Sequence, residues 1–212
     1  LNPNLRLVDI PALQKVVARR NEGRGEDEKV VTIIDNTFAT PFCQRPISLG
    51  VDIVVHSLTK DIGGFGTDMG GGVMTSKDYE SHLLLFRKDF GGVLSPKGAW
   101  PILVYGLPTL VLRMKKQQET ALVVARALEK HPKIERVFYP GLSSFPQREI
   151  AERQMIDFEG NFAPGSMIYF LLKGKGNHAA ERLIDHVARE AYTVTLAVSL
   201  GQIRTLIENP FS

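Results

Sequence analysis

The chain has 212 residues, of which 43% are hydrophobic and 23% charged, an ordinary globular composition that excludes intrinsic disorder, a collagen-like repeat and a coiled coil. Lys and Arg number 26 and Asp and Glu 23, so the net charge of +3 gives no electrostatic argument for nucleic-acid binding. The single cysteine excludes an internal disulfide framework and a cysteine-rich zinc site, and the apolar runs are too short to span a bilayer.

The first part of the chain has the pattern of an α/β layer. Apolar side chains recur on one face over residues 10–20, which predicts a helix. Two apolar, β-branched runs, 30–34 and 51–55, are predicted to be fully buried strands of a parallel sheet, because a crossover joins them. A glycine-rich segment follows at 63–72, and residues 73–75 predict a third strand.

The second part begins with helices. They are predicted over 76–87, with Ser76 as the N-cap, and over 96–106 and 110–131. The expected buried side chains of the last helix are Leu112, Ala121, Val124, Ala125 and Leu128. Beyond it, strands are predicted over 134–139, 167–172 and 192–197, and helices over 150–155 and 179–188. The long helix is expected to bridge two domains, 1–115 and 116–212, the second a smaller α+β unit.

Polar side chains gather where the first two predicted strands end. Asp35 follows one strand, and Ser57, Thr59 and Lys60 follow the other. Open parallel sheets bind ligands at these strand ends. An amine can form a Schiff base with an aldehyde, hydroxyls at i and i+2 can bind a phosphate, and a buried carboxylate can keep a ring nitrogen protonated. Together these groups describe a pyridoxal phosphate site.

Simpler interpretations remain open on spacing alone. A lysine after a strand is usually a solvated surface residue, and an aspartate at a strand end is often a turn or helix cap. The glycine run at 63–72 lacks the Gly-Lys-Ser/Thr of a phosphate-binding Walker loop. It also lacks the last glycine of the dinucleotide fingerprint.

Several motifs, in order along the whole chain, resemble one known family. Asp35-Asn36-Thr37-Phe38-Ala39-Thr40-Pro41 and Val54-Val55-His56-Ser57-Leu58-Thr59-Lys60 closely resemble the signature of the Cys/Met-metabolism family of pyridoxal phosphate enzymes. Shorter motifs agree with it: Leu94-Ser95-Pro96, Leu112-Arg113-Met114, Tyr139-Pro140-Gly141-Leu142 and Ser199-Leu200-Gly201. The resemblance implies an aspartate-aminotransferase-like (fold type I) cofactor domain, its C-terminal part over 1–115, followed by part of a small C-terminal domain.

The family's residue roles carry over to matching positions, and pyridoxal 5'-phosphate is the implied cofactor. Lys60 resembles the Schiff-base lysine, which also moves protons between substrate carbons. Asp35 resembles the partner of the pyridine nitrogen. Ser57 and Thr59 resemble the phosphate ligands, and Asn2 resembles the asparagine that bonds the ring hydroxyl.

The chain also departs from the family's pattern. Asp61 stands where the family usually has Tyr, the segment 64–68 lacks the usual His, and the loop 20–28 is longer. His56 is interpreted as structural, and Cys43 is expected to pack under the site loop without a catalytic role. Family members are also longer, so further cofactor and substrate ligands are expected outside this stretch, which alone should bind the cofactor poorly.

Two positions bear on the substrate. Ser199 resembles the residue beside the substrate carboxylate, and Val198 stands where members that act on cystathionine have Glu. An apolar residue cannot pair with the distal ammonium of cystathionine, which favours a thioether such as L-methionine. The segment 140–147 favours the same substrate by resemblance. Val198 as a plain core residue of the strand end remains the simpler alternative.

The expected reaction is therefore γ-elimination on a sulfur amino acid. Cystathionine γ-elimination, γ-replacement on an O-acyl-homoserine and a non-catalytic fragment remain alternatives. The family implies a homotetramer, a dimer of dimers that share active sites. Besides the amino-acid substrate and other copies of the chain, neither nucleic acid nor a membrane is expected as a partner. With no secretory signal pattern the expected location is the cytoplasm.

Overall fold

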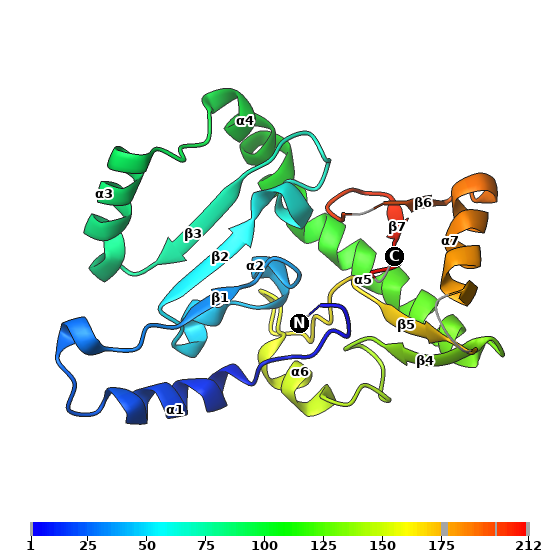
Figure 1. Cartoon of the computed structure of the whole chain (residues 1–212), viewed down its shortest axis with the longest axis horizontal. Coiled ribbons are helices and arrows are strands. Elements are labelled where there is room, and N and C mark those ends of the chain that lie inside the picture. The colour runs from blue at the N-terminus through cyan, green and yellow to red at the C-terminus, as the bar shows by residue number, and fades with distance from the viewer. Residues whose placement is uncertain (1, 175–177, 198, 211–212) are drawn as a thin grey trace.

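The computed structural model describes residues 2–174, 178–197 and 199–210, which form a mixed α/β fold (Figure 1). The α-helices in this part are α1 (Ile10–Asn21), α2 (Thr40–Cys43), α3 (Glu80–Phe90), α4 (Pro96–Pro101), α5 (Leu107–Lys130), α6 (Arg148–Gln154) and α7 (His178–Glu190). The strands are β1 (Ile33–Asp35), β2 (Ile53–Ser57), β3 (Gly71–Thr75), β4 (Ile134–Phe138), β5 (Tyr169–Leu172), β6 (Val194–Leu196) and β7 (Thr205–Ile207). Among the residues described, no helix has the length and apolar content needed to cross a membrane.

The first sheet has the order β1-β2-β3. The parallel pairing of β1 with β2 confirms the prediction, and β3 is antiparallel to β2. β1 and β2 begin three and two residues, respectively, after the starts predicted at residues 30 and 51. The reason lies in Asp52, whose carboxylate accepts the Thr32 N–H at 2.7 Å and the Thr32 hydroxyl at 2.6 Å, so side-chain bonds hold the chains together just before the regular pairing of Ile33 with Ile53.

The two faces of this sheet differ in burial, which corrects the prediction of fully buried strands. Val54 and His56 point to a buried face, where Val54 packs with Ile10 of α1. The opposite face is open to solvent, as shown by the exposed side chains of Ile33 (63%) and Val73 (52%). By strand alternation, Asp35, Val55 and Ser57 lie on this open face.

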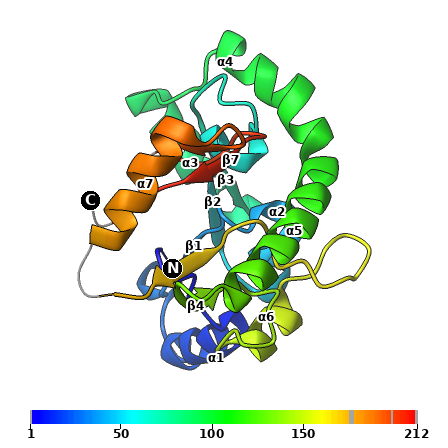
Figure 2. The ribbon, with the colours of Figure 1, turned by 90° about the vertical axis from the view of Figure 1, so that its right-hand side faces the viewer.

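Helix α5 is the long helix that runs from α4 toward β4 (Figure 2). Its side chains belong to two hydrophobic clusters. Leu110 and Met114 belong to a cluster with α2 and α6, and Ala121 and Ala125 belong to a second cluster with β4. Burial of these two alanines was predicted. The predicted burial of Leu112 and Val124 is wrong, since they are 71% and 41% exposed.

Other local differences have simple causes. Ser76 does not cap a helix, because its hydroxyl donates to Asp78 at 2.8 Å and a 3-10 turn, Lys77–Tyr79, precedes α3. The predicted 96–106 helix is α4 followed by a π-helical turn, Ile102–Gly106, that runs directly into α5. In the second part, β4 pairs antiparallel with β5, and β6 pairs parallel with β7, a strand that was not predicted.

Candidate active site

Lys60 lies in a tight turn at the carboxyl end of β2. The turn, Leu58–Ile62, is a single π-helical turn within which Lys60 alone departs from helical backbone angles (φ −85°, ψ −140°). Two bonds fix the turn against the start of β3: the Leu58 N–H donates to the Gly70 carbonyl at 2.8 Å, and the Gly70 N–H donates to Thr59 Oγ1 at 3.1 Å. Lys60 therefore presents its side chain from a rigid base.

A segment 139 residues further along the chain meets Lys60. The Lys60 Nζ donates a hydrogen bond to Ser199 Oγ. Two residues later, Gly201 (φ +101°) lies so close that a Cβ there would stand 2.4 Å from the Lys60 Cα and 2.8 Å from the Thr59 carbonyl oxygen. The structure thus brings together Lys60 and Ser199, which the sequence could associate only through the family resemblance.

Two hydrogen bonds between side chains and backbone amides link Asp35 to the end of β2, just before the Lys60 turn. Its Oδ1 accepts the Thr37 N–H at 2.9 Å, and the Thr37 hydroxyl accepts the Ser57 N–H at 2.8 Å. Thr37 is buried, whereas Asp35 is exposed in the described chain rather than buried. This connection sets the end of β1 in register with the end of β2.

Two polar groups near the strand ends are buried. His56 is buried and its Nδ1 has no hydrogen-bond partner in the described chain; burial lowers the pKa of the ring, and the Asp35 charge raises it. A ring with a lowered pKa is neutral at pH 7, which is consistent with a structural role. Cys43 is buried in the cluster of α2, α5 and α6, and burial raises the pKa of its thiol, which fits the absence of a catalytic role.

Arg113 of α5 holds the Lys60 turn, a role that the sequence reasoning missed. Its guanidinium donates to the carbonyls of Asp61 at 2.7 Å, Gly106 at 2.9 Å and Ile62 at 3.4 Å, and its Nε donates to Thr109 Oγ1 at 3.0 Å. The only sequence signal was its place in the Leu112-Arg113-Met114 motif. Arg113 therefore ties the turn after the lysine to the start of α5.

Comparison with known proteins identifies the family of this chain. A family model described as Cys/Met metabolism PLP-dependent enzyme matches residues 1–212. The chain belongs to this family. It is 44% identical to an L-methionine gamma-lyase of Fusobacterium nucleatum subsp. polymorphum, over all of this chain and 49% of the relative. An O-succinylhomoserine sulfhydrylase of Pseudomonas aeruginosa is 38% identical over 99% of this chain and 47% of the relative.

The fold is shared with a solved structure of the same family. The crystal structure of apo CalE6, a methionine gamma lyase from Micromonospora echinospora, matches with a TM-score of 0.82 and 32% identity, covering 96% of this chain and 50% of that one. The predicted family and fold class are thereby confirmed. The chain spans about half the length of the curated relatives it matches. Pyridoxal 5'-phosphate (PLP) is the cofactor of the Cys/Met metabolism family.

The residues at the strand ends fit this cofactor. Lys60 supplies a half-buried amine, and the Ser57 hydroxyl makes no hydrogen bond within the described chain. Thr59 Oγ1 accepts the Gly70 N–H, while its own proton meets the Gly70 carbonyl only at 3.5 Å, a distance at which a hydrogen bond is weak. That proton is available to a phosphate oxygen. Asp35 keeps one carboxylate oxygen for a ring nitrogen.

Two predicted site residues are not joined to this group by any described contact. Asn2 lies at the start of the described chain with an exposed side chain, so its role as a cofactor ligand stays a prediction. Val198 lies outside the described residues. Its neighbour Ser199 is described and exposed, and it reaches Lys60 through its hydroxyl.

Replacing Gly201 by alanine is expected to separate the Ser199 segment from the Lys60 turn. The added Cβ would meet main-chain atoms at 2.4–2.8 Å, which cannot move as a flexible side chain can. Gly160 (φ +87°) is a matched control, because its backbone has the same hand and a Cβ there meets nothing within 4 Å. In thermal denaturation, the free energy of unfolding should fall by about 1–3 kcal/mol more in Gly201→Ala than in Gly160→Ala. Equal losses would contradict the close packing.

Proposed function

We propose that the full-length protein catalyses γ-elimination on a sulfur amino acid, most specifically the conversion of L-methionine and water to methanethiol, ammonia and 2-oxobutanoate. The observation that carries the proposal is the Lys60 amine held at the carboxyl end of β2 and bonded to Ser199. Support for the substrate comes from the 44% identity to an L-methionine gamma-lyase over the whole of this chain.

In this proposal Lys60 is the catalytic residue. When bound there, PLP would supply an electron sink for the negative charge that develops on the substrate carbons. Lys60 Nζ would hold the cofactor through its aldehyde carbon, and the same amine would take up the substrate Cα proton and carry it onward. The hydrogen bond to Ser199 supports this role, because it fixes the amine on the side from which Ser199 would meet the substrate carboxylate.

The remaining residues would bind and orient the cofactor. The Asp35 carboxylate accepts a hydrogen bond from the protonated ring nitrogen, and this charge pair strengthens the ring's pull on electrons. The Ser57 and Thr59 hydroxyls donate to phosphate oxygens, and Asn2 donates its amide to the ring hydroxyl. The hydrogen bonds that link Asp35, Thr37 and Ser57 support this division, because they hold the carboxylate and the hydroxyls at the same sheet edge.

Val198 is proposed as the residue that meets the distal part of the substrate. Its apolar side chain offers no partner to an ammonium group, whereas a methyl thioether needs none. The residue type and its place beside Ser199 are the support for a preference for L-methionine over cystathionine.

A γ-replacement reaction is the second candidate. The 38% identity to an O-succinylhomoserine sulfhydrylase favours it, because that relative covers nearly the whole of this chain. In such a reaction an external thiol adds where the leaving group departs. A chain that only mediates subunit association is the third possibility.

Product analysis of the full-length protein with PLP separates these candidates. With L-methionine, we expect 2-oxobutanoate and methanethiol in equal amounts, and less 2-oxobutanoate from cystathionine. Val198→Glu should shift the preference toward cystathionine, while Val123→Glu, a substitution at an exposed position of α5, should not. Formation of a thioether from O-succinylhomoserine plus a thiol, without 2-oxobutanoate from methionine, would overturn the elimination proposal.

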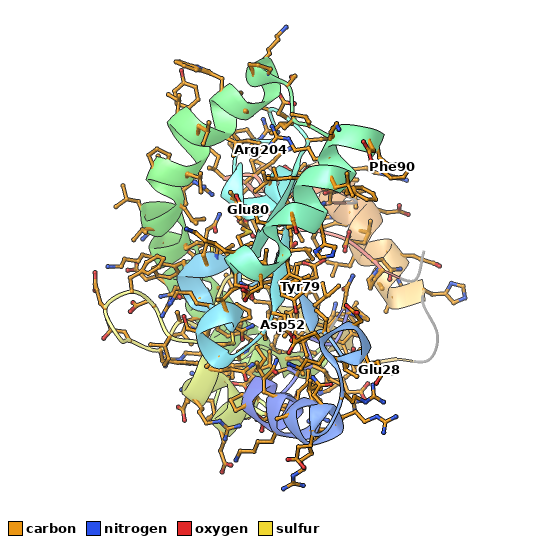
Figure 3. The ribbon with its side chains drawn as sticks, turned by 90° about the vertical axis from the view of Figure 1, so that its left-hand side faces the viewer. Glu28, Asp52, Tyr79, Glu80, Phe90 and Arg204 are labelled. Carbon is orange, nitrogen blue, oxygen red and sulfur yellow. The ribbon has the colours of Figure 1, made fainter. Side chains whose placement is uncertain are left out.

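Domain organisation and assembly are further parts of the proposal. A boundary between 1–115 and 116–212 is supported by the two clusters that α5 joins, one at Met114 and the other at Ala121. A homotetramer is supported by α3, which exposes an apolar surface ending in the stacked rings of Phe86 and Phe90 (Phe90 is labelled in Figure 3). A cytoplasmic location is supported by the single cysteine.

A further inference from the structure

Asp61, the residue after Lys60, has a buried carboxyl group that the proposed chemistry does not use. Its side chain is 4% exposed, and its Oδ2 is inaccessible to water and has no hydrogen-bond partner in the described chain. Burial of an ionised carboxylate without a hydrogen-bonded partner is costly, and buried polar groups without partners are few in native proteins. This group therefore requires an explanation.

The Arg113 guanidinium, whose charge acts on Asp61, does not donate a hydrogen bond to the Asp61 carboxylate. Arg113 donates to the main-chain carbonyl of Asp61, to the carbonyls of Ile62 and Gly106, and to the Thr109 hydroxyl. None of the ion pairs found among the described residues includes Asp61. The guanidinium acts on the carboxylate only through its charge.

We infer that Asp61 is a positioning residue for Lys60, which holds the Lys60 turn closed while its carboxyl is neutral and loosens the turn when the carboxyl is ionised. The functional meaning of this switch rests on the role proposed above for Lys60. The switch itself follows from the position of the carboxyl, which is buried and belongs to a residue of the Leu58–Ile62 turn that presents Lys60.

The surrounding charges set the pH range of the switch. Burial raises the pKa of Asp61 from its ordinary 3.8 to about 6, while the charges of Arg113 and Lys60 oppose this rise. The third titratable group that interacts with it is Cys43 of α2, whose thiol is kept protonated by burial. Because the pKa is higher in the closed turn than in water, the closed turn is favoured fully below about pH 4 and loses this stabilisation as the pH rises to about 6.

Hydrogen exchange on the full-length protein saturated with PLP tests the inference. The Gly63 N–H donates to the Leu58 carbonyl at 2.9 Å and the Gly64 N–H to the Lys60 carbonyl at 2.8 Å, so these two amides report opening of the turn. We compare the opening constant of the turn at pH 4.5 and pH 7.5, after correction for intrinsic exchange. Its rise over this range should be about 25-fold larger in the wild type than in Asp61→Asn.

The controls separate a local pH effect from a general one. Asp185→Asn removes an exposed carboxylate of α7 and should keep the wild-type pH profile. Asp61→Ser replaces Asp61→Asn if the amide prevents folding, and it should give the same flattened profile. Equal pH profiles in the wild type and in both Asp61 variants would overturn the inference. A protein that shows the predicted difference but has no lyase activity would support the switch while refuting the proposed function.

Discussion

Replacement of Lys60 by alanine is expected to reduce the turnover of L-methionine by at least about 10³-fold, because both the cofactor link and the proton transfer depend on one amine. Lys60 occupies the carboxyl end of β2, and its Nζ donates to Ser199 Oγ. Formation of 2-oxobutanoate by the full-length enzyme measures the loss. The visible absorption band of the bound cofactor should disappear in the same variant.

A second lysine provides the control for this experiment. Lys116 lies on the exposed side of α5, where its one ion pair among the described residues is with Glu119 at 3.5 Å. Exposed pairs of this kind contribute little, so Lys116→Ala should keep the activity and the absorption band. A Lys60→Ala enzyme with the activity of the Lys116→Ala enzyme would remove Lys60 from the mechanism.

Replacement of Arg113 by alanine should have the largest effect on stability. Four hydrogen bonds join this side chain to the Lys60 turn and to the start of α5, and their loss leaves carbonyls of Asp61, Ile62 and Gly106 without this donor. Bonds to a charged donor are stronger than average, so a loss of about 3 kcal/mol in the free energy of unfolding is expected. The shift of the urea midpoint measures it.

Two further variants test the cause of this loss. Arg113→Lys keeps the charge but cannot span the same carbonyls, so it should recover only a part of the stability. Arg126→Ala changes an exposed arginine of the same helix, and its free energy of unfolding should stay within about 0.5 kcal/mol of the wild-type value. If Arg113→Lys were as stable as the wild type, the charge rather than the hydrogen-bond geometry would hold the turn.

The main elements of the fold could be predicted from periodicity, but their edges and faces could not. Helices α1 and α5 carry apolar residues at helical spacing, and their bounds were predicted within a few residues. β1 begins late because the Asp52 carboxylate takes the Thr32 N–H, a tertiary contact that composition does not reveal. The short strand β7 was missed, since three residues give no detectable period.

Some residues of the candidate site could likewise be grouped from the sequence, and others could not. Asp35, Ser57 and Lys60 could be grouped from sequence because parallel strands end at one sheet edge. The contact of Ser199 with Lys60 depends on the path of the intervening 139 residues, so only the family resemblance indicated it. The burial of the Asp61 carboxyl could not be predicted at all, because a charged residue in a glycine-rich context normally faces solvent.

The most direct test of the central claim is to locate the cofactor on the chain. The full-length protein is incubated with PLP, its cofactor link is reduced with borohydride, and the digested peptides are analysed by mass spectrometry. We expect the added cofactor mass on Lys60, and its absence when L-methionine is supplied in excess before reduction, since the substrate amine displaces Lys60. The cofactor mass on another lysine, or on none, would show that Lys60 does not hold the cofactor.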